Sequence, residues 1–551
     1  MSPSQSVQKN TWSRRRFAQT LSLAPAFLRG ARLEAADSLF PLGVASGDPD
    51  SSSVVLWTRL APEPLSGGGL RRSAVAVEWE VASDEGMVNV IRRGAAVAES
   101  SEGHRVLVVA TGLPADSWLY YRFLALGQTS RVGRTRTFPQ PGQRDFLRFA
   151  LASCQNYEAG YYAAYRDMVE RDAPGETIDC VIHVGDYIYE QGASPGALRR
   201  HNGGEIFTVD DYRNRYALYR LDPHLQEAHA RFPFLVTWDD HETDNNYAGR
   251  IPEEGAPRPE FFLERRANAY KVYSETMPLR PENRFDGIAQ KLYRSIDFGG
   301  LARFHILDSR QYRTDQPASG LFGSTDPASL ALEPVFGVKL YAPNEILNPA
   351  ATMTGFHQQN WLFESLLRSR TKWNILAQQV VLARWNLGPA VGVFGSPLSD
   401  LRNVDAWDGY DAAQRRLLAF LAAARPSNPV VLTGDIHSAW ASNLLADFDD
   451  PASDAVAAEF VCTSISSDFF GGTATHLAAQ LTLPANPHIR HLNGLFRGYA
   501  LCTVEPSQCV TEFRAVWDAR DPSSPVFADR RFRLQAGFNA RRNGGQALEP
   551  A

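Results

Sequence analysis

The sequence predicts an α/β protein in which a small antiparallel β-sandwich precedes a larger domain of alternating strands and helices. The early part of the chain shows short strand patterns separated by turn residues, whereas the later part alternates buried apolar runs with helical segments. The length of 551 residues also exceeds what one hydrophobic core normally serves. About two or three domains are therefore expected.

Residues 40–138 are expected to form the sandwich. Strand-like stretches at 54–57, 74–81, 105–110 and 118–125 are separated by turn sequences such as Gly-Asp-Pro and Gly-Gly-Gly. Strands at this spacing, without helical patterns between them, are typical of a small antiparallel sandwich. The sequence Pro139-Gln140-Pro141-Gly142-Gln143 is predicted to be a linker.

The larger domain is expected over residues 145–518. Apolar runs predict buried strands at 146–153, 180–185, 232–238, 301–307, 373–377 and 429–433. Helical patterns occupy 161–171, 261–275 and 358–368. This alternation predicts an α/β or layered α-β-α domain. Two polar, Gly/Pro-rich insertions at about 313–352 and 386–408 are predicted to be loops.

The first 36 residues have the layout of an export signal. The basic string Ser13-Arg14-Arg15-Arg16-Phe17 is followed by a short apolar stretch and by an alanine-rich segment that could hold a cleavage site. The Ser-Arg-Arg-x-Phe pattern favours the twin-arginine type. The sequence therefore predicts export by the twin-arginine machinery to the periplasm or the cell exterior.

Composition excludes several classes of protein. Hydrophobic residues at 44% and charged residues at 21% are ordinary globular values and exclude a disordered or fibrous chain. The net charge of −5 lacks the basic character of a dedicated nucleic-acid binder. Outside the N-terminus, no apolar run approaches the roughly 20 residues that span a bilayer. Five cysteines are too few for a disulfide scaffold.

Polar and titratable residues follow the predicted buried strands. In α/β sheets the carboxyl ends of the strands meet at one edge, where ligands bind. We therefore expect one shared edge to carry the residues that end these runs: Cys154, Asp186, Tyr189, Asp239, Asp240, His241, Asn246, Asp308, Arg310, Asp435 and His437.

The residue types at this edge indicate bound metal ions. Several carboxylates brought together would repel one another unless cations neutralise them. The chain has only five lysines, and none follows these strands. Thiolate, phenolate, imidazole and carboxylate together suit a trivalent or transition metal such as iron. Aspartates with asparagine suit calcium, magnesium or manganese.

Three strings carry a family resemblance. Gly-Asp-x-x-Tyr at 185–189, Asp-Asp-His-Glu at 239–242 and Gly-Asp-Ile-His at 434–437 resemble the calcineurin-like metallophosphoesterase pattern. The particular residues in these motifs are similar to those of the PhoD-type alkaline phosphatase/phosphodiesterase branch. The similarity extends over about residues 40–518. It implies a layered α-β-β-α catalytic domain behind a sandwich like those of immunoglobulin and fibronectin domains.

The resemblance also implies a ferric ion and calcium ions, and two calcium ions are expected. Matched motif by motif, the iron ligands would be Cys154, Asp186, Tyr189 and His437. Asp186 would bridge to calcium, whose further ligands would be Asp240, Asn246 and Asp435. Asn245 and Asp244 are the adjacent alternatives to Asn246.

The activity that the resemblance implies is hydrolysis of phosphate esters by metal-hydroxide attack. The implied biological role is phosphate scavenging. His241 would protonate the leaving group, and Arg310, with Arg265 and Arg266, could bind phosphate oxygens. Salt bridges within the domain are the alternative role for Arg265 and Arg266. Two other functions stay open: phospholipase D-like cleavage of phospholipid head groups, and a non-catalytic, metal-stabilised surface-binding protein.

Three further features have simpler interpretations. Gly-Ala-Ser-Pro-Gly at 192–196 matches the nucleophile elbow of serine hydrolases, but no strand runs directly into it. Cys502 and Cys509 flank a predicted hairpin turn, where two core thiols are favoured over a disulfide. Residues 519–551 are predicted to form a C-terminal tail, which is either a lid over the cleft or a frayed surface end.

Overall fold

The computed structural model describes residues 38–70, 73–253, 255–316, 346–387, 402–469, 472–538 and 547–551. The predicted export signal and most of the two predicted loops lie outside these residues. Among the helices of the described residues, none is both long and apolar enough to cross a membrane.

The strands of the described residues form two large sheets and one small sheet. The large ten-stranded sheet runs in the order β22 (Leu548–Pro550), β21 (Val526–Gln535), β20 (Gln508–Val516), β19 (Arg497–Val504), β9 (Leu147–Ala152), β10 (Cys180–His183), β11 (Pro233–Val236), β1 (Val44–Gly47), β2 (Ser53–Arg59) and β5 (Arg105–Thr111). The seven-stranded sheet runs β12 (Arg294–Phe298), β13 (Ala302–Ile306), β14 (Trp373–Ala377), β15 (Pro429–Thr433), β17 (Ala455–Val461), β16 (Ala439–Leu445) and β18 (Ile489–Asn493).

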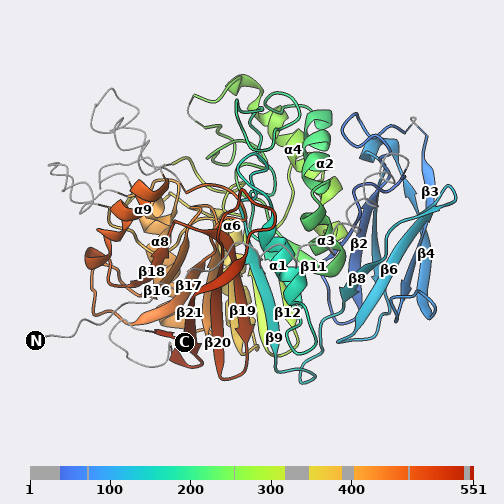
Figure 1. Cartoon of the computed structure of the whole chain (residues 1–551). Coiled ribbons are helices and arrows are strands. Elements are labelled where there is room, and N and C mark those ends of the chain that lie inside the picture. Colours follow the sequence, from blue (N-terminus) through green and yellow to red (C-terminus); the bar gives the residue numbers. More distant parts are fainter. Residues whose placement is uncertain are drawn as a thin grey trace, which may run out of the picture.

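The small antiparallel sheet lies at one end of the molecule (Figure 1). It contains β4 (Val90–Ala98), β3 (Val75–Ala82), β6 (Trp118–Ala125), β7 (Gln128–Thr129) and β8 (Gly133–Arg136). Its apolar side chains share one buried cluster with those of β1, β2 and β5, among them Val54, Val77 and Phe123. The predicted antiparallel N-terminal unit is confirmed, but β1 pairs in parallel with β11. One layer of this unit is therefore continuous with the ten-stranded sheet.

Helices cover the outer faces of the two large sheets. Four of them share a buried cluster with the ten-stranded sheet: α1 (Ala163–Arg171), α2 (Val209–Arg220), α3 (Pro223–Arg231) and α4 (Phe262–Thr276). Three others share a cluster with the seven-stranded sheet: α6 (Gly355–Arg368), α8 (Asp411–Ala424) and α9 (Gly472–Gln480). The order helix, sheet, sheet, helix confirms the predicted α-β-β-α layers.

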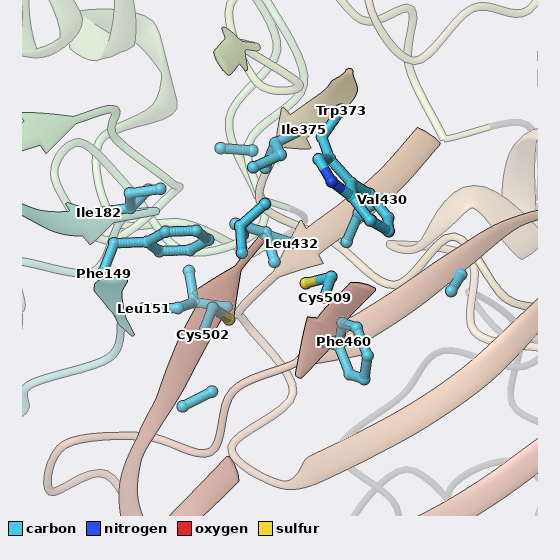
Figure 2. Close-up of a cluster of buried hydrophobic side chains, with 14 of the residues drawn as sticks. Phe149, Leu151, Ile182, Trp373, Ile375, Val430, Leu432, Phe460, Cys502 and Cys509 are labelled. Atoms are coloured by element: carbon cyan, nitrogen blue, oxygen red, sulfur yellow. The ribbon is translucent and has the colours of Figure 1, made fainter. Parts of the chain in front are cut away.

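Residue alternation in β9 shows how the layers are built. Phe149 and Leu151 face the cluster between the two large sheets, whereas Ala150 and Ala152 face the helices. Because successive side chains of a strand point to opposite faces, one apolar run serves both layers. Figure 2 shows the inter-sheet cluster, which contains Phe149 and Leu151 from β9 and Val430 and Leu432 from β15.

The C-terminal residues correct the predicted tail. Strand β21 pairs antiparallel with β20 along Val526 to Gln535, and β22 pairs with β21. Phe532 and Leu534 are buried in the inter-sheet cluster. Residues 526–535 are thus a structural strand. Both the lid and the frayed end were wrong, because apolar side chains at alternate positions anchor this segment to the sheet.

Cys502 and Cys509 are two core thiols without a disulfide, as predicted. Both thiols are free and buried, and Figure 2 shows them in the inter-sheet core. Cys502 lies opposite Thr511 and Cys509 opposite Val504, so that the two cysteines are not directly paired across the hairpin.

Candidate metal centre

The residues predicted to share one edge come from two sheets. Cys154, Asp186 and Asp240 follow β9, β10 and β11 of the ten-stranded sheet, whereas Arg310 follows β13 and Asp435 follows β15 of the seven-stranded sheet. The single-edge prediction was wrong in this respect. The carboxyl ends of both sheets face a common site, because packing of the two sheets aligns these parallel strands.

The first group in this site combines sulfur, oxygen and nitrogen. Ligand atoms of Cys154, Asp186 and His437 all lie within 4.8 Å of one another, and all three residues are buried. The Tyr189 hydroxyl lies 3.0 Å from Asp186 Oδ2 and 3.1 Å from His437 Nε2. The structure therefore brings together the four residues that the sequence analysis assigned to iron.

A hydrogen bond orients His437. Its Nδ1 lies 2.8 Å from the Asp468 carbonyl oxygen, which can only accept. Nδ1 therefore carries the hydrogen, and the lone pair of Nε2 faces Tyr189 and Asp186. A backbone carbonyl that fixes the outer ring nitrogen is the usual support of a metal-binding histidine.

Two further groups consist mainly of carboxylates. One contains Asp186, Asp240 and His241, and the other contains Asp239, Asp240 and Asp435. Asp186 joins the first group to the second, and Asp240 joins the second to the third. Asp239 was part of the predicted Asp-Asp-His-Glu string but was not assigned as a ligand.

Asn246 lies beside the carboxylates. Its backbone N–H donates to Asp240 Oδ2 at 2.6 Å. The alternative Asp244 accepts from Arg265 Nη1 at 2.6 Å, and the side chain of Asn245 donates to Glu253 Oε1 at 2.5 Å. Both neighbours are thus engaged outside the site. Ligation by the Asn246 side chain stays a prediction.

Buried oxygens of this site lack hydrogen-bond partners. Among the described residues, Asp186 Oδ1, Asp239 Oδ2 and Asp240 Oδ1 are buried without one. Leaving a buried polar atom unsatisfied costs about 1–3 kcal/mol, and more for a charged group. Burial also raises the pKa of Asp239 and Asp435 well above the usual carboxyl value. Cations would remove both costs, so the donor set fits metal ions.

The backbone is strained where the ligands lie. Cys154, Asp186, Asn246, Asp435 and His437 have φ values of 58°, 56°, 50°, 65° and 54°. Non-glycine residues rarely adopt this left-handed conformation, which costs of order 1–3 kcal/mol each. Such strain concentrates at functional sites. At Cys154, Asp186, Asp435 and His437 the backbone turns sharply in the loop after a strand, and their ligand atoms lie in the candidate metal-binding groups.

Comparison with known proteins identifies the family. A family model described as PhoD-like phosphatase matches residues 149–513, and one described as its N-terminal domain matches residues 24–139. The chain is 44% identical over 541 residues to "Alkaline phosphatase D" of Bacillus subtilis (strain 168), covering 95% of this chain and 87% of that protein. The chain belongs to the PhoD-like phosphatase family.

Solved structures agree with this family. A structure titled "Structure of PhoD" has a TM-score of 0.82 and 42% sequence identity, and covers 96% of this chain and 93% of its own. A purple acid phosphatase from yellow lupin seeds has a TM-score of 0.52 at 13% identity, covering 90% of this chain and 75% of its own. That more distant likeness extends to the fold alone. The chain is an alkaline phosphatase D homologue and a metal-dependent phosphoric ester hydrolase.

Arg310 of this PhoD-like chain lies at the centre of the carboxylates. It is fully buried and donates to Asp239, to Asp405 Oδ1 at 2.9 Å and to Asp435 Oδ1 at 3.1 Å. Burial alone would raise the pKa of Asp240, but the charges of Arg310 and His241 lower it below the usual carboxyl value. Asp405 belongs to the segment predicted only as a loop, and the sequence analysis missed it.

The other two candidate arginines have structural partners. Arg265 pairs with Asp244 at 2.6 Å and with Glu205 at 2.8 Å. Arg266 donates to the Gly249 carbonyl oxygen at 2.5 Å. These contacts match the structural alternative of the sequence analysis. Ser194 of the serine-hydrolase-like string lies in an exposed loop, and its backbone N–H donates to Glu158.

His241 is held beside the metal-binding groups of the PhoD-like site. Its Nδ1 lies 2.7 Å from Glu190 Oε2, and its ring stacks on Tyr189 at 4.1 Å between centroids. Burial alone would lower the pKa of His241, but the negative charges of Glu190, Asp240 and Asp186 outweigh it and raise the pKa well above the usual value. A positively charged imidazole can donate a proton.

Glu242 supports the PhoD-like site from behind. Its carboxylate accepts the backbone N–H groups of Tyr187 at 2.7 Å, Asp239 at 2.9 Å and Asp186 at 3.0 Å. Burial, with the nearby Asp186 charge, raises its pKa to about 8. Glycine at position 185 allows the loops after β10 and β11 to lie close together, since a Cβ at 185 would collide with Asp239. One side chain thus fixes the loops after β10 and β11.

Replacing Glu242 by glutamine is expected to lower kcat/KM about 10–100-fold, the usual effect of losing an outer-shell support of a metal ligand. The amide NH₂ would face backbone N–H donors, so Asp186 and Asp239 would shift. Steady-state kinetics and metal content measure the effect. Glu275→Gln, a buried carboxylate that pairs with Arg213 and Lys271, serves as the control. Wild-type kinetics in Glu242→Gln would contradict the assignment.

Proposed function

We propose that the chain is an exported phosphatase and phosphodiesterase that holds ferric iron and calcium. The iron would be held by Cys154, Asp186, Tyr189 and His437. Calcium would be held by Asp186, Asp240, Asn246 and Asp435, with Asp239 as a further oxygen ligand. Its substrates would be mono- or diesters of phosphate.

The observation that carries this proposal is the composition of the two neighbouring ligand sets. The first combines a thiol, a phenol and an imidazole with one carboxylate, and this mixture suits a transition metal. The second is dominated by carboxylate oxygens, and hard oxygen ligands suit calcium. Asp186 belongs to both sets and would bridge the two ions.

The bound ions would polarise the phosphoryl group and activate water. The residues of the chain supply the remaining functions. Glu190 holds His241 so that the imidazolium can give its proton to the departing alkoxide. Arg310 would add positive charge beside the phosphate. Its buried hydrogen bonds to Asp239, Asp405 and Asp435 hold this charge in place.

The cellular role follows from the N-terminal sequence. The Ser13-Arg14-Arg15-Arg16-Phe17 string supports export through the twin-arginine machinery. That route moves folded proteins, so the metals could be acquired before export. We infer a periplasmic or extracellular enzyme that releases phosphate for uptake.

Metal analysis with a substrate panel tests the proposal. Protein purified from the native host should contain iron and calcium, and it should hydrolyse p-nitrophenyl phosphate or bis-p-nitrophenyl phosphate. Zinc in place of both metals would overturn the metal assignment. Hydrolysis confined to phospholipid vesicles would favour phospholipase D-like action. Coloured protein inactive on every ester would favour a binding protein.

Chelation of calcium separates the two sites. Treatment with a calcium chelator should stop turnover. It should leave unchanged the visible absorption that a thiolate or phenolate gives when bound to ferric iron, because Cys154 and Tyr189 hold only the iron. Restored activity on adding calcium back is the control. Full activity of the calcium-free protein would show that the second site is misassigned.

A further inference from the structure

Two buried serines contact the two anionic ligand atoms that the proposed function gives to iron. Ser153 Oγ lies 3.2 Å from Cys154 Sγ. Ser467 Oγ lies 2.7 Å from the Tyr189 hydroxyl oxygen. Ser153 and Ser467 are 1% and 2% exposed, so that water does not compete for these contacts.

The Ser153 contact continues to a second thiol. Cys462 Sγ lies 3.3 Å from Ser153 Oγ. Ser153 follows β9 of one large sheet, and Cys462 follows β17 of the other. With Cys154 as a thiolate, the Ser153 hydroxyl can donate only to that sulfur or to the other thiol. Cys462 S–H can then donate to the Ser153 oxygen, which completes a relay of two hydrogen bonds.

The fold holds Ser153 in place. A Cβ on Gly434 would lie 2.7 Å from both Cβ and Oγ of Ser153, which is closer than real Cβ contacts. Glycine at this position of the Gly-Asp-Ile-His string therefore makes room for the serine. The backbone carbonyl of Ser153 accepts from Ile465 N–H at 2.9 Å. The backbone of Ser153 is therefore anchored beside the sulfur.

Ser467 is fixed in a similar way. Its hydroxyl donates to the Cys154 carbonyl oxygen at 2.9 Å and accepts from the Asn156 backbone N–H at 3.2 Å. The same oxygen touches Tyr189. When Tyr189 is a phenolate, the one hydroxyl proton of Ser467 can turn toward it, because a charged acceptor forms the stronger hydrogen bond.

We propose that Ser153, with Cys462 behind it, and Ser467 are positioning residues that tune the thiolate and the phenolate of the metal centre separately. This inference rests on the proposed function. A hydrogen bond to a ligand atom withdraws electron density from it, and hydrogen bonds to ligand sulfur help set the properties of a metal centre. Each serine would therefore set how strongly its ligand donates to the metal.

Absorption spectra of the iron-loaded variants test the proposal. Ser153→Ala should move the sulfur-to-iron band to longer wavelength and leave the phenolate band in place. Ser467→Ala should move only the phenolate band, whereas Ser467→Thr should keep the wild-type spectrum. Cys462→Ala should move the sulfur-to-iron band to longer wavelength by a smaller amount than Ser153→Ala does. Cys462→Ser should keep the wild-type spectrum. The control is Ser442→Ala, a buried serine of β16.

Cobalt(II)-loaded protein is measured in parallel, because its thiolate band reports the same sulfur without iron. Iron-free native protein would overturn the proposed metal, and the cobalt band would still test Ser153 and Cys462. Unchanged bands in both Ser153→Ala and Ser467→Ala, at wild-type metal content and melting temperature, would overturn the tuning role. A wild-type protein without a thiolate band for either metal would overturn both proposals.

Discussion

Cys154→Ala is expected to abolish the visible absorption of the metal centre, because the metal is lost, and to lower kcat/KM about 10³-fold or more. The thiol lies in the buried group with Asp186 and His437, and alanine offers no ligand atom. Loss of the metal would remove several kcal/mol of transition-state stabilisation, and each ~1.4 kcal/mol is a factor of ten in rate. Absorption, metal content and steady-state kinetics measure the result. Tyr189→Phe should likewise abolish the band and most activity.

Cys502→Ala is the matched control for this prediction. Cys502 is also a fully buried thiol, but it packs in the inter-sheet core (Figure 2). Its replacement should cost stability through the lost packing and leave the band and kcat/KM unchanged. A Cys154→Ala protein that kept both its colour and its activity would refute the ligand assignment.

Asp186→Asn is expected to empty both metal sites together. Asp186 belongs to the sulfur-containing group and to the carboxylate group, and its Oδ1 has no hydrogen-bond partner. The neutral amide would weaken binding of each cation, so iron and calcium contents should fall and kcat/KM should drop about 10³-fold or more. Elemental analysis of the purified variant measures both metals at once.

Asp167→Asn provides the comparison for Asp186→Asn. Asp167 is a buried aspartate that accepts from Tyr499 and Arg514, away from the metal-binding groups. Its replacement should lower the melting temperature and keep both metals. If Asp186→Asn lost only one of the two metals, Asp186 would not be the bridge between the sites.

The catalytic layers could be predicted because their strands are local signals. Runs such as 373–377 and 429–433 are apolar at all but one position each, and both form strands with those bounds. Other elements left weaker signals. The Thr208 capping box with Asp211 begins α2, and Asp222-Pro223 begins α3. Such caps mark helices without strong periodicity, and they could have located both.

The pairing of distant segments could not be predicted. Strand β1 pairs with β11, almost 190 residues later in the chain, and β19 pairs with β9, about 350 residues earlier in the chain. Neither contact leaves a periodic signal, because the partner of a strand is decided by tertiary packing. The same reason explains the C-terminal strands, whose alternating pattern was mixed with arginines.

The candidate site was partly predictable. Ligand types that directly follow buried runs, such as Cys154 and Asp186, were found from their position. Asp239 and Asp240 were both expected at the edge, but only Asp240 was expected as a ligand, because the sequence could not distinguish two adjacent aspartates. Asp405 lies in a segment predicted only as a loop, and its contacts with Arg310 and Arg313 place it beside the site. Glu242 was visible in its string, but its three backbone partners were not.

The parallel pairing of β1 with β11 has a consequence for how this architecture can be divided. β11 ends three residues before Asp239, and β1 covers its outer edge. A shortened chain beginning near residue 149 would leave that edge bare, and an uncovered strand edge invites self-association. The N-terminal unit and the catalytic domain are therefore joined through one shared sheet, and a catalytic domain produced alone is expected to associate with copies of itself.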